Sequence, residues 1–156
     1  MALTRVRTGG VDTTVNPTFQ LNQTSNQSLS DSTLTTMTWD ASAWDTASIT
    51  SVGSNNVTIT AVTAGYWILY AVNRIGQRPN RQQLYILKGS TDLVYTENAI
   101  NDAGSGANPS IQASWSGPLV TGDVLTVKAW QSSGGSQNTV ADGIGVQFWG
   151  IRVRGA

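Results

Sequence analysis

The stretch that decides the fold is "TAGYWILYAVNRIG", residues 63–76, in which seven apolar or aromatic side chains follow one another between two turn signals. Successive side chains of a strand point to opposite faces, so this run gives a strand two apolar faces. Alternate residues make up the two faces, Tyr66, Ile68, Tyr70 and Val72 on one and Trp67, Leu69 and Ala71 on the other. A sandwich of two sheets buries only one face of each sheet, so the second face needs another cover.

Two further segments repeat the pattern. Residues 142–154 place Phe148 on one face and Trp149 and Ile151 on the other, and "LYIL" at 84–87 repeats it briefly. An aromatic side chain buries about 150–250 Å². At about 25 cal/mol per Å², burial of the aromatic residues on the second face would contribute several kcal/mol of stabilising free energy. The pattern favours self-association around a symmetry axis. A loop or an N-terminal segment packed over a sheet is the alternative explanation.

The remainder of the chain predicts short strands. They are expected at 33–39, 47–52, 56–61, 65–74, 82–88, 92–98, 110–115, 123–131 and 142–154, separated by Gly, Asn, Asp, Ser and Pro clusters. No segment has a convincing helical period. The spacing predicts an all-β sandwich or barrel, with a jelly roll and an immunoglobulin-like sandwich both open. Residues 1–30 are too polar to fold alone, so we expect an extended N-terminal arm at 1–30 and one domain at 31–156.

Composition excludes several classes of function. Nine acidic and nine basic residues cancel, and charged residues make up 12% of the chain, so no basic surface for nucleic acid is predicted. The chain has no Cys and no His, which removes disulfides, thiolates and the commonest catalytic bases and zinc ligands. No apolar run approaches the roughly 18 residues of a membrane span, and no signal peptide is readable, so we expect a chain made and kept in a soluble compartment.

Catalysis would have to come from carboxylates. Asp40 and Asp45 flank Trp44, an arrangement that suggests a glycosidase pair beside a sugar-stacking ring. Aspartates in exposed turns are the ordinary explanation, so we expect no enzyme and no cofactor. Of the six tryptophans, Trp44 is the one outside the expected strands, and it is the one worth testing as a stacking platform.

Three stretches together resemble a known family. They are "TLTTMTWDASAWDT" (33–46), "VTITAVTAGYWILYAVNRIGQRPNRQQLYILKGS" (57–90) and "LVTGDVLTVKAWQSSGG…GIGVQFWGIRVR" (119–154). Their order is similar to that of the jelly-roll superfamily of the complement globular head and tumour necrosis factor, particularly the versions in bacteriophage particles. The resemblance implies a jelly-roll sandwich that assembles into a homotrimer. The predicted trimer interface comprises Trp67, Leu69, Tyr85, Trp149 and Ile151. The acidic cluster of calcium-binding members has no match here, so no metal is carried over.

The resemblance implies a protein of the virion, made in the host cytoplasm. We expect a capsid decoration, or cement, protein that binds the major capsid protein on the outer shell where subunits meet. The residues expected in the capsid-binding arm are Arg5, Arg7, Val11, Val15 and Phe19. The alternative is the receptor-binding tip of a tail fibre or spike that recognises a host glycan. A tip needs a shaft, whereas this chain is expected to have an arm and no shaft. Neither nucleic acid nor a membrane is an expected partner.

Overall fold

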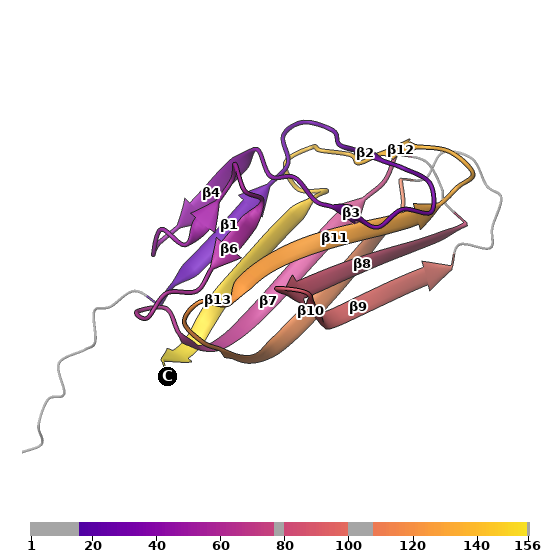
Figure 1. Cartoon of the computed structure of the whole chain (residues 1–156). Helices are drawn as coiled ribbons and strands as arrows, with labels where there is room; N and C mark the ends of the chain where they lie inside the picture. Colours follow the sequence, from indigo (N-terminus) through magenta and orange to yellow (C-terminus); the bar gives the residue numbers. More distant parts are fainter. Residues whose placement is uncertain (1–15, 77–79, 100–107, 156) are drawn as a thin grey trace, which may run out of the picture.

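The computed structural model of the chain describes residues 16–76, 80–99 and 108–155, and this part contains strands and no helix (Figure 1). The strands are β1 Thr18–Asn22, β2 Ser28–Leu29, β3 Thr35–Thr36, β4 Ala41–Asp45, β5 Thr50–Ser51, β6 Asn56–Thr58, β7 Gly65–Arg74, β8 Arg81–Lys88, β9 Thr91–Ala99, β10 Ser110–Leu119, β11 Val124–Ser132, β12 Gln137–Asn138 and β13 Gln147–Gly155. The all-β prediction is confirmed.

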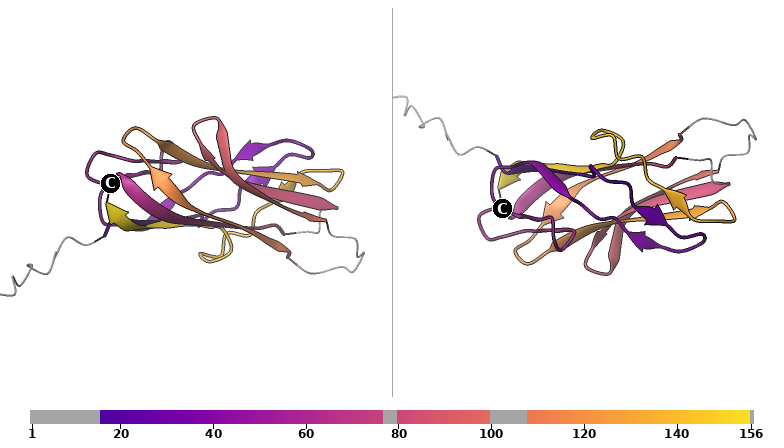
Figure 2. Two further views of the ribbon diagram at one scale, coloured as in Figure 1. Left: turned by 90° about the horizontal axis from the view of Figure 1, so that it is seen from below. Right: turned by 90° about the horizontal axis from the view of Figure 1, so that it is seen from above.

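Two antiparallel sheets pack face to face, as the two views of Figure 2 show. The first sheet has the strand order β10-β7-β13-β1-β4. The second has the order β5-β6-β11-β8-β9, with β3 also paired to β11. Sequence neighbours β7 and β8 therefore lie in different sheets, as do β9 and β10. This exchange between layers gives a jelly-roll sandwich rather than a meander.

The deciding stretch forms β7 with the predicted bounds. Along this strand the side chains alternate in exposure: Trp67 and Leu69 are fully buried, whereas Ile68 between them is exposed. The predicted strands at 82–88, 92–98 and 123–131 match β8, β9 and β11 to within one residue at each end. The last strand begins later than predicted, because Asp142 Oδ1 accepts the backbone N–H groups of Ile144 and Gly145 and so forms a turn.

Residues 16–30 belong to the folded domain, which corrects their assignment to the arm. Strand β1 pairs with β13 on one side and with β4 on the other, so it lies inside the first sheet. Phe19, predicted to bind a capsid, is fully buried in the core. The other predicted arm residues, Arg5, Arg7, Val11 and Val15, lie outside the described residues.

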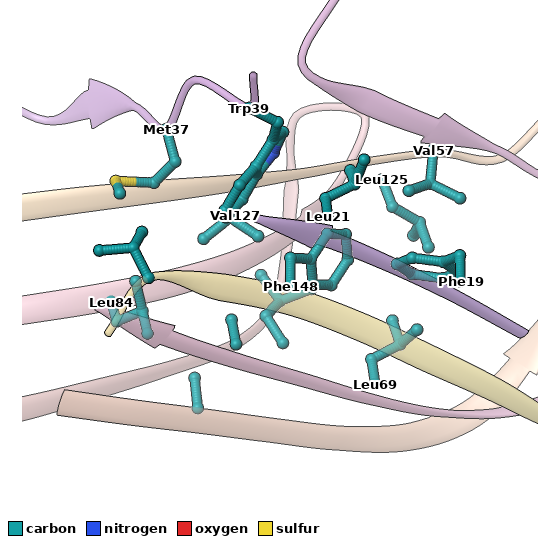
Figure 3. Close-up of a cluster of buried hydrophobic side chains, with 14 of the residues drawn as sticks. Phe19, Leu21, Met37, Trp39, Val57, Leu69, Leu84, Leu125, Val127 and Phe148 are labelled. Atoms are coloured by element: carbon teal, nitrogen blue, oxygen red, sulfur yellow. The ribbon is translucent and has the colours of Figure 1, made fainter. Parts of the chain in front are cut away.

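The core fills the space between the sheets with aliphatic and aromatic side chains (Figure 3). Phe148 of β13 contacts two aromatic rings, that of Phe19 edge-on at 5.0 Å between ring centroids and that of Trp39 stacked at 6.2 Å. Leu84 and Val127 close the cluster from the second sheet. Trp39 therefore packs against the core from the loop before β4, although β3 ends at Thr36.

Gly150 allows the Phe19 ring to lie against the backbone of β13. A Cβ at this position would come within 2.6 Å of Phe19 Cε1 and 2.8 Å of Leu69 Cδ2. Phe19 and Gly150 are also direct partners in the β1–β13 pairing. The glycine is thus required by close packing in the middle of the sheet.

Carboxylates close turns in this chain, and their hydrogen bonds lower their pKa values. Asp45 accepts bonds from the Thr50 backbone N–H at 2.7 Å, the Thr50 hydroxyl at 2.8 Å and the Ala47 N–H at 3.2 Å. Burial alone would raise the pKa of Asp45, but these donors outweigh it and hold the pKa below its usual value of 3.8. Burial would likewise raise the pKa of Asp40, but hydrogen bonds from the N–H groups of Thr24 and Ser25 outweigh it and lower the pKa.

Replacement of Gly150 by alanine is expected to destabilise the fold. The added methyl group collides with Phe19 and Leu69, and overpacking of a full core costs about 1–3 kcal/mol. Urea denaturation followed by tryptophan fluorescence, at fixed protein concentration, measures the loss. Gly53→Ala is the matched control, because no atom lies within 4 Å of its Cβ position. Equal stabilities for the two variants would contradict the proposed packing.

Asp45 makes stability depend on pH in the acid range. The pKa of Asp45 is lower in the folded chain than in the unfolded chain. Its ionised carboxylate therefore stabilises the fold at a pH above the pKa of the unfolded chain, and this contribution is lost as the pH falls through the pKa of the folded chain. Asp45→Asn should therefore lower the melting temperature at neutral pH, and the gap to the wild type should narrow as the pH falls below 3.8. A constant gap across melting curves from neutral to acid pH would show that the carboxylate charge contributes nothing.

Candidate functional site

The outer face of the first sheet carries a largely apolar surface. Cross-strand pairing aligns one row across the sheet, from Ser114 through Tyr70, Trp149 and Gln20 to Trp44. The neighbouring row contains Ile68 beside Ile151. We call the surface formed by Trp44, Ile68, Tyr70, Trp149 and Ile151 the apolar face. It is the candidate functional site.

Solvent reaches much of the apolar face in the single chain. Trp44 is 49% exposed, Ile68 39% and Ile151 37%. Tyr70 and Trp149 stack at 5.2 Å between ring centroids, and burial raises the pKa of the Tyr70 hydroxyl. Tyr70 and Trp149 at the centre of the face are partly buried, whereas Trp44, Ile68 and Ile151 around them are exposed.

A groove of about 360 Å³ runs along one margin of this face. It is lined by Thr18, Phe19, Trp44, Trp149, Gly150 and Ile151. Trp44 lies on β4 and Trp149 on β13, and β1 runs between these two strands and contributes Thr18 and Phe19 to the lining. The lining is almost wholly apolar, so the groove suits an apolar side chain or a ring-shaped ligand.

The predicted interface residues do not form one surface. Trp149 and Ile151 lie on the apolar face, where their role in a trimer stays a prediction. Trp67 and Leu69 are fully buried between the two sheets of a single chain, so their assignment to a subunit interface is corrected. Tyr85 lies on the outer side of the second sheet, where it stacks on Tyr95 at 5.4 Å.

The sequence pattern did not identify Ile68, Tyr70 and Trp44 as members of the exposed surface. The alternation in 66–72 placed Ile68 and Tyr70 on a common face, but it did not say which face lies inside. Trp44 was singled out only as a possible platform for sugars. The signal that it gave was an aromatic ring in a polar stretch, and the structure places that ring beside the groove.

Asp40 and Asp45, the two carboxylates considered for catalysis, accept hydrogen bonds from backbone N–H groups. Asp40 binds the N–H groups of Thr24 and Ser25, and Asp45 closes the turn that leads to Thr50. Their pKa values are lowered, which is opposite to what a general acid needs. In the part of the chain that the structure describes, no three acidic side chains form a group able to hold a metal ion. The same part contains no helix long and apolar enough to cross a membrane.

One end of the sandwich is also exposed and apolar. Val62 is 76% exposed and Val120 is 60% exposed. The turns that carry them are linked, because the Ile59 N–H donates to the Asp123 carbonyl and the Ile59 carbonyl accepts the Gly122 N–H. Arg152 binds the Val62 carbonyl through Nη1 and the Pro17 carbonyl through its backbone N–H. We call this region, where the chain enters β1, the entry end.

Comparisons with known proteins bear on the fold. No family model matches the sequence, and no curated protein matches it. Among solved structures, Eiger TNF from S. frugiperda superposes with a TM-score of 0.68 at 13% identity, covering 91% of this chain and 96% of that chain. Murine APRIL at pH 8.5 gives 0.68 at 15% identity, with 89% and 100% covered. The globular domain of zebrafish complement 1qA protein gives 0.60 at 11% identity, with 90% and 99% covered.

These likenesses match the family that the sequence motifs indicated, and at such low identity they establish the fold alone. The resemblance to the versions in bacteriophage particles stays a prediction. The chain has the jelly-roll fold of tumour necrosis factor-like proteins and complement globular heads.

Proposed function

We propose that the chain forms a homotrimer through its apolar face, and that the trimer is a non-enzymatic decoration, or cement, protein of a bacteriophage capsid. It binds the major capsid protein on the outside of the shell where subunits meet. The observation that carries the proposal is the apolar face itself. Three-fold assembly rather than another symmetry follows from the resemblance to the trimeric jelly-roll superfamily.

The free energy of burying apolar area favours the packing of a second copy against this face. Trp44, Ile68 and Ile151 offer apolar area that contributes about 25 cal/mol per Å² when it is removed from water. A patch of this kind is uncommon on a soluble monomer. The groove beside Trp44 gives a protruding side chain of the neighbouring copy a place to pack, which favours a specific rather than a loose association.

The entry end supports attachment to a shell. Val62 and Val120 are the two turns' most exposed apolar side chains, and β1 starts beside them at Thr18. In a trimer, three copies of this end would act together, so that weak contacts sum to firm binding. The arm residues Arg5, Arg7, Val11 and Val15 precede this point in the chain and complete the proposed attachment.

The alternative function is the tip of a tail fibre or spike that binds a host glycan. The groove favours it, because Trp44, Trp149 and Thr18 line it together, and aromatic faces near a hydroxyl suit a sugar ring. The two functions differ in where the protein sits. Cryo-electron microscopy of intact particles would find density of this fold on the head in the first case and at the end of the tail in the second.

A charge on the apolar face should prevent assembly. The double variant Ile68→Glu, Ile151→Glu is expected to run as a folded monomer, because two carboxylates cannot be covered by an apolar partner. Sedimentation velocity at low micromolar concentration measures the mass, and circular dichroism checks the sheet. Ile144→Glu is the control, since Ile144 is 73% exposed and lies in the turn before β13. A double variant that keeps the wild-type mass would refute assembly through this face.

Removal of the arm should separate assembly from attachment. Deletion of residues 1–15 is expected to leave the trimer intact and to abolish binding to particles, because β1 and Phe19 are retained. The assay is cosedimentation with particles of a phage from which the gene for this chain has been deleted. Truncation must stop before β1, since loss of Phe19 would open the core. Normal cosedimentation of the truncated trimer would refute the role of the arm.

A further inference from the structure

Buried polar side chains gather at one end of the sandwich interior. Among the described residues seven polar side chains are buried, and five of them lie where β7 ends and β8 begins. The five are Gln23, Asn73, Gln82, Gln131 and Thr139. The remainder of the interior is apolar, so this cluster, which we call the amide end, differs in chemistry from the core of Figure 3.

Gln23 in the amide end is hydrogen-bonded at both ends of its side-chain amide, and Gln131 at one end only. The Gln23 amide group donates to the Thr38 carbonyl at 2.8 Å and its carbonyl accepts the Thr139 hydroxyl at 2.7 Å. Gln131 donates through Nε2 to the carbonyls of Leu29 and Gly135, at 3.1 and 2.9 Å, while its Oε1 has no partner. The Gln131 bonds hold β2 and the turn after β11 against β11.

Asn73 and Gln82 are different, because neither end of either side-chain amide has a partner. Both atoms of Asn73 and both atoms of Gln82 are buried without a hydrogen bond in the described structure, although the side chains are 1% and 0% exposed. An unpaired buried polar group costs about 1–3 kcal/mol, so four such atoms together would cost about as much as the net stability of a domain.

The topology brings these amides to the same end of the interior. Asn73 is the residue before the last of β7, in the first sheet, and Gln82 is the second residue of β8, in the second sheet. The segment 75–80 is all that separates the two strands, and β7 contacts β8. Gln82 is also the direct cross-strand partner of Gln131. Buried unpaired atoms of three strands, which belong to both sheets, therefore lie at the same end of the interior.

The donor set selects the ligand. Asn73 and Gln82 each present one acceptor oxygen and one NH₂ donor, and Gln131 adds an acceptor. A cation would satisfy the oxygens but leave the NH₂ groups opposed, and no carboxylate belongs to the cluster. Water both donates and accepts, and buried water makes about three hydrogen bonds to groups of this kind. We propose that Asn73, Gln82 and Gln131 form an internal binding site in which ordered water joins the two sheets.

A crystal structure at high resolution tests the site directly. The expected result is electron density for water within hydrogen-bond distance of both Asn73 and Gln82. A direct hydrogen bond between the two side-chain amides, with no water at either, would overturn the proposal. This test is independent of the proposed function, because it holds whether the trimer is a capsid protein or not.

A double-mutant cycle tests the site in solution. Asn73→Leu and Gln82→Leu are each expected to lower the urea midpoint, and the double variant should lose less than the sum, because loss of one amide already weakens the shared water. The control cycle pairs Asn73→Leu with Thr63→Val, since Thr63 is buried before the opposite end of β7. Additive losses in the first cycle would overturn the proposal. Should a variant fail to fold, the crystal structure of the wild-type chain decides.

Discussion

Strands β7 and β13 pair along their central residues, and the other features of the molecule depend on this contact. The pairing sets Leu69 beside Gly150 on the inner side and Tyr70 beside Trp149 on the outer side. The inner side admits the Phe19 ring and so fixes β1 in the sheet. The outer side forms the apolar face. One pair of strands thus builds both the core of the single chain and the surface proposed to bring copies together.

The sequence predicted the positions of the strands better than it predicted which face of each strand is buried. The alternation within 66–72 is a local property, so β7 and its two faces were readable. Which face lies inside depends on the opposite sheet, whose Leu84 and Val127 belong to the same core cluster as Trp67 and Leu69, and no local pattern contains that information. Ile68 and Tyr70 were therefore not recognised as the exposed members. The order of motifs predicted the jelly roll, because turns and strands at that spacing report on topology.

Strand β1 shows why a polar segment is hard to place. Within Thr18–Asn22, Phe19 and Leu21 are apolar, and the flanking residues are Asn, Gln, Thr and Ser. Such a segment cannot bury enough surface by itself, and the sequence alone therefore indicated an arm. In the structure it gains two strand partners, β13 and β4, and the partners supply the hydrogen bonds and contacts that the segment lacks. Tertiary contacts override the local preference here.

The position of β1 has a consequence for biosynthesis. Thr18 pairs with Ile151, so the two partners are separated by nearly the whole chain, and pairings between distant residues form slowly. The first sheet cannot close until residues 147–155, which form β13, have left the ribosome. Until then, the edge of β7 that pairs with β13 has no partner strand. The nascent chain therefore carries an unprotected, aggregation-prone strand from the completion of β7 until β13 emerges, and chaperones that cover β7 during this interval should raise the yield of folded protein.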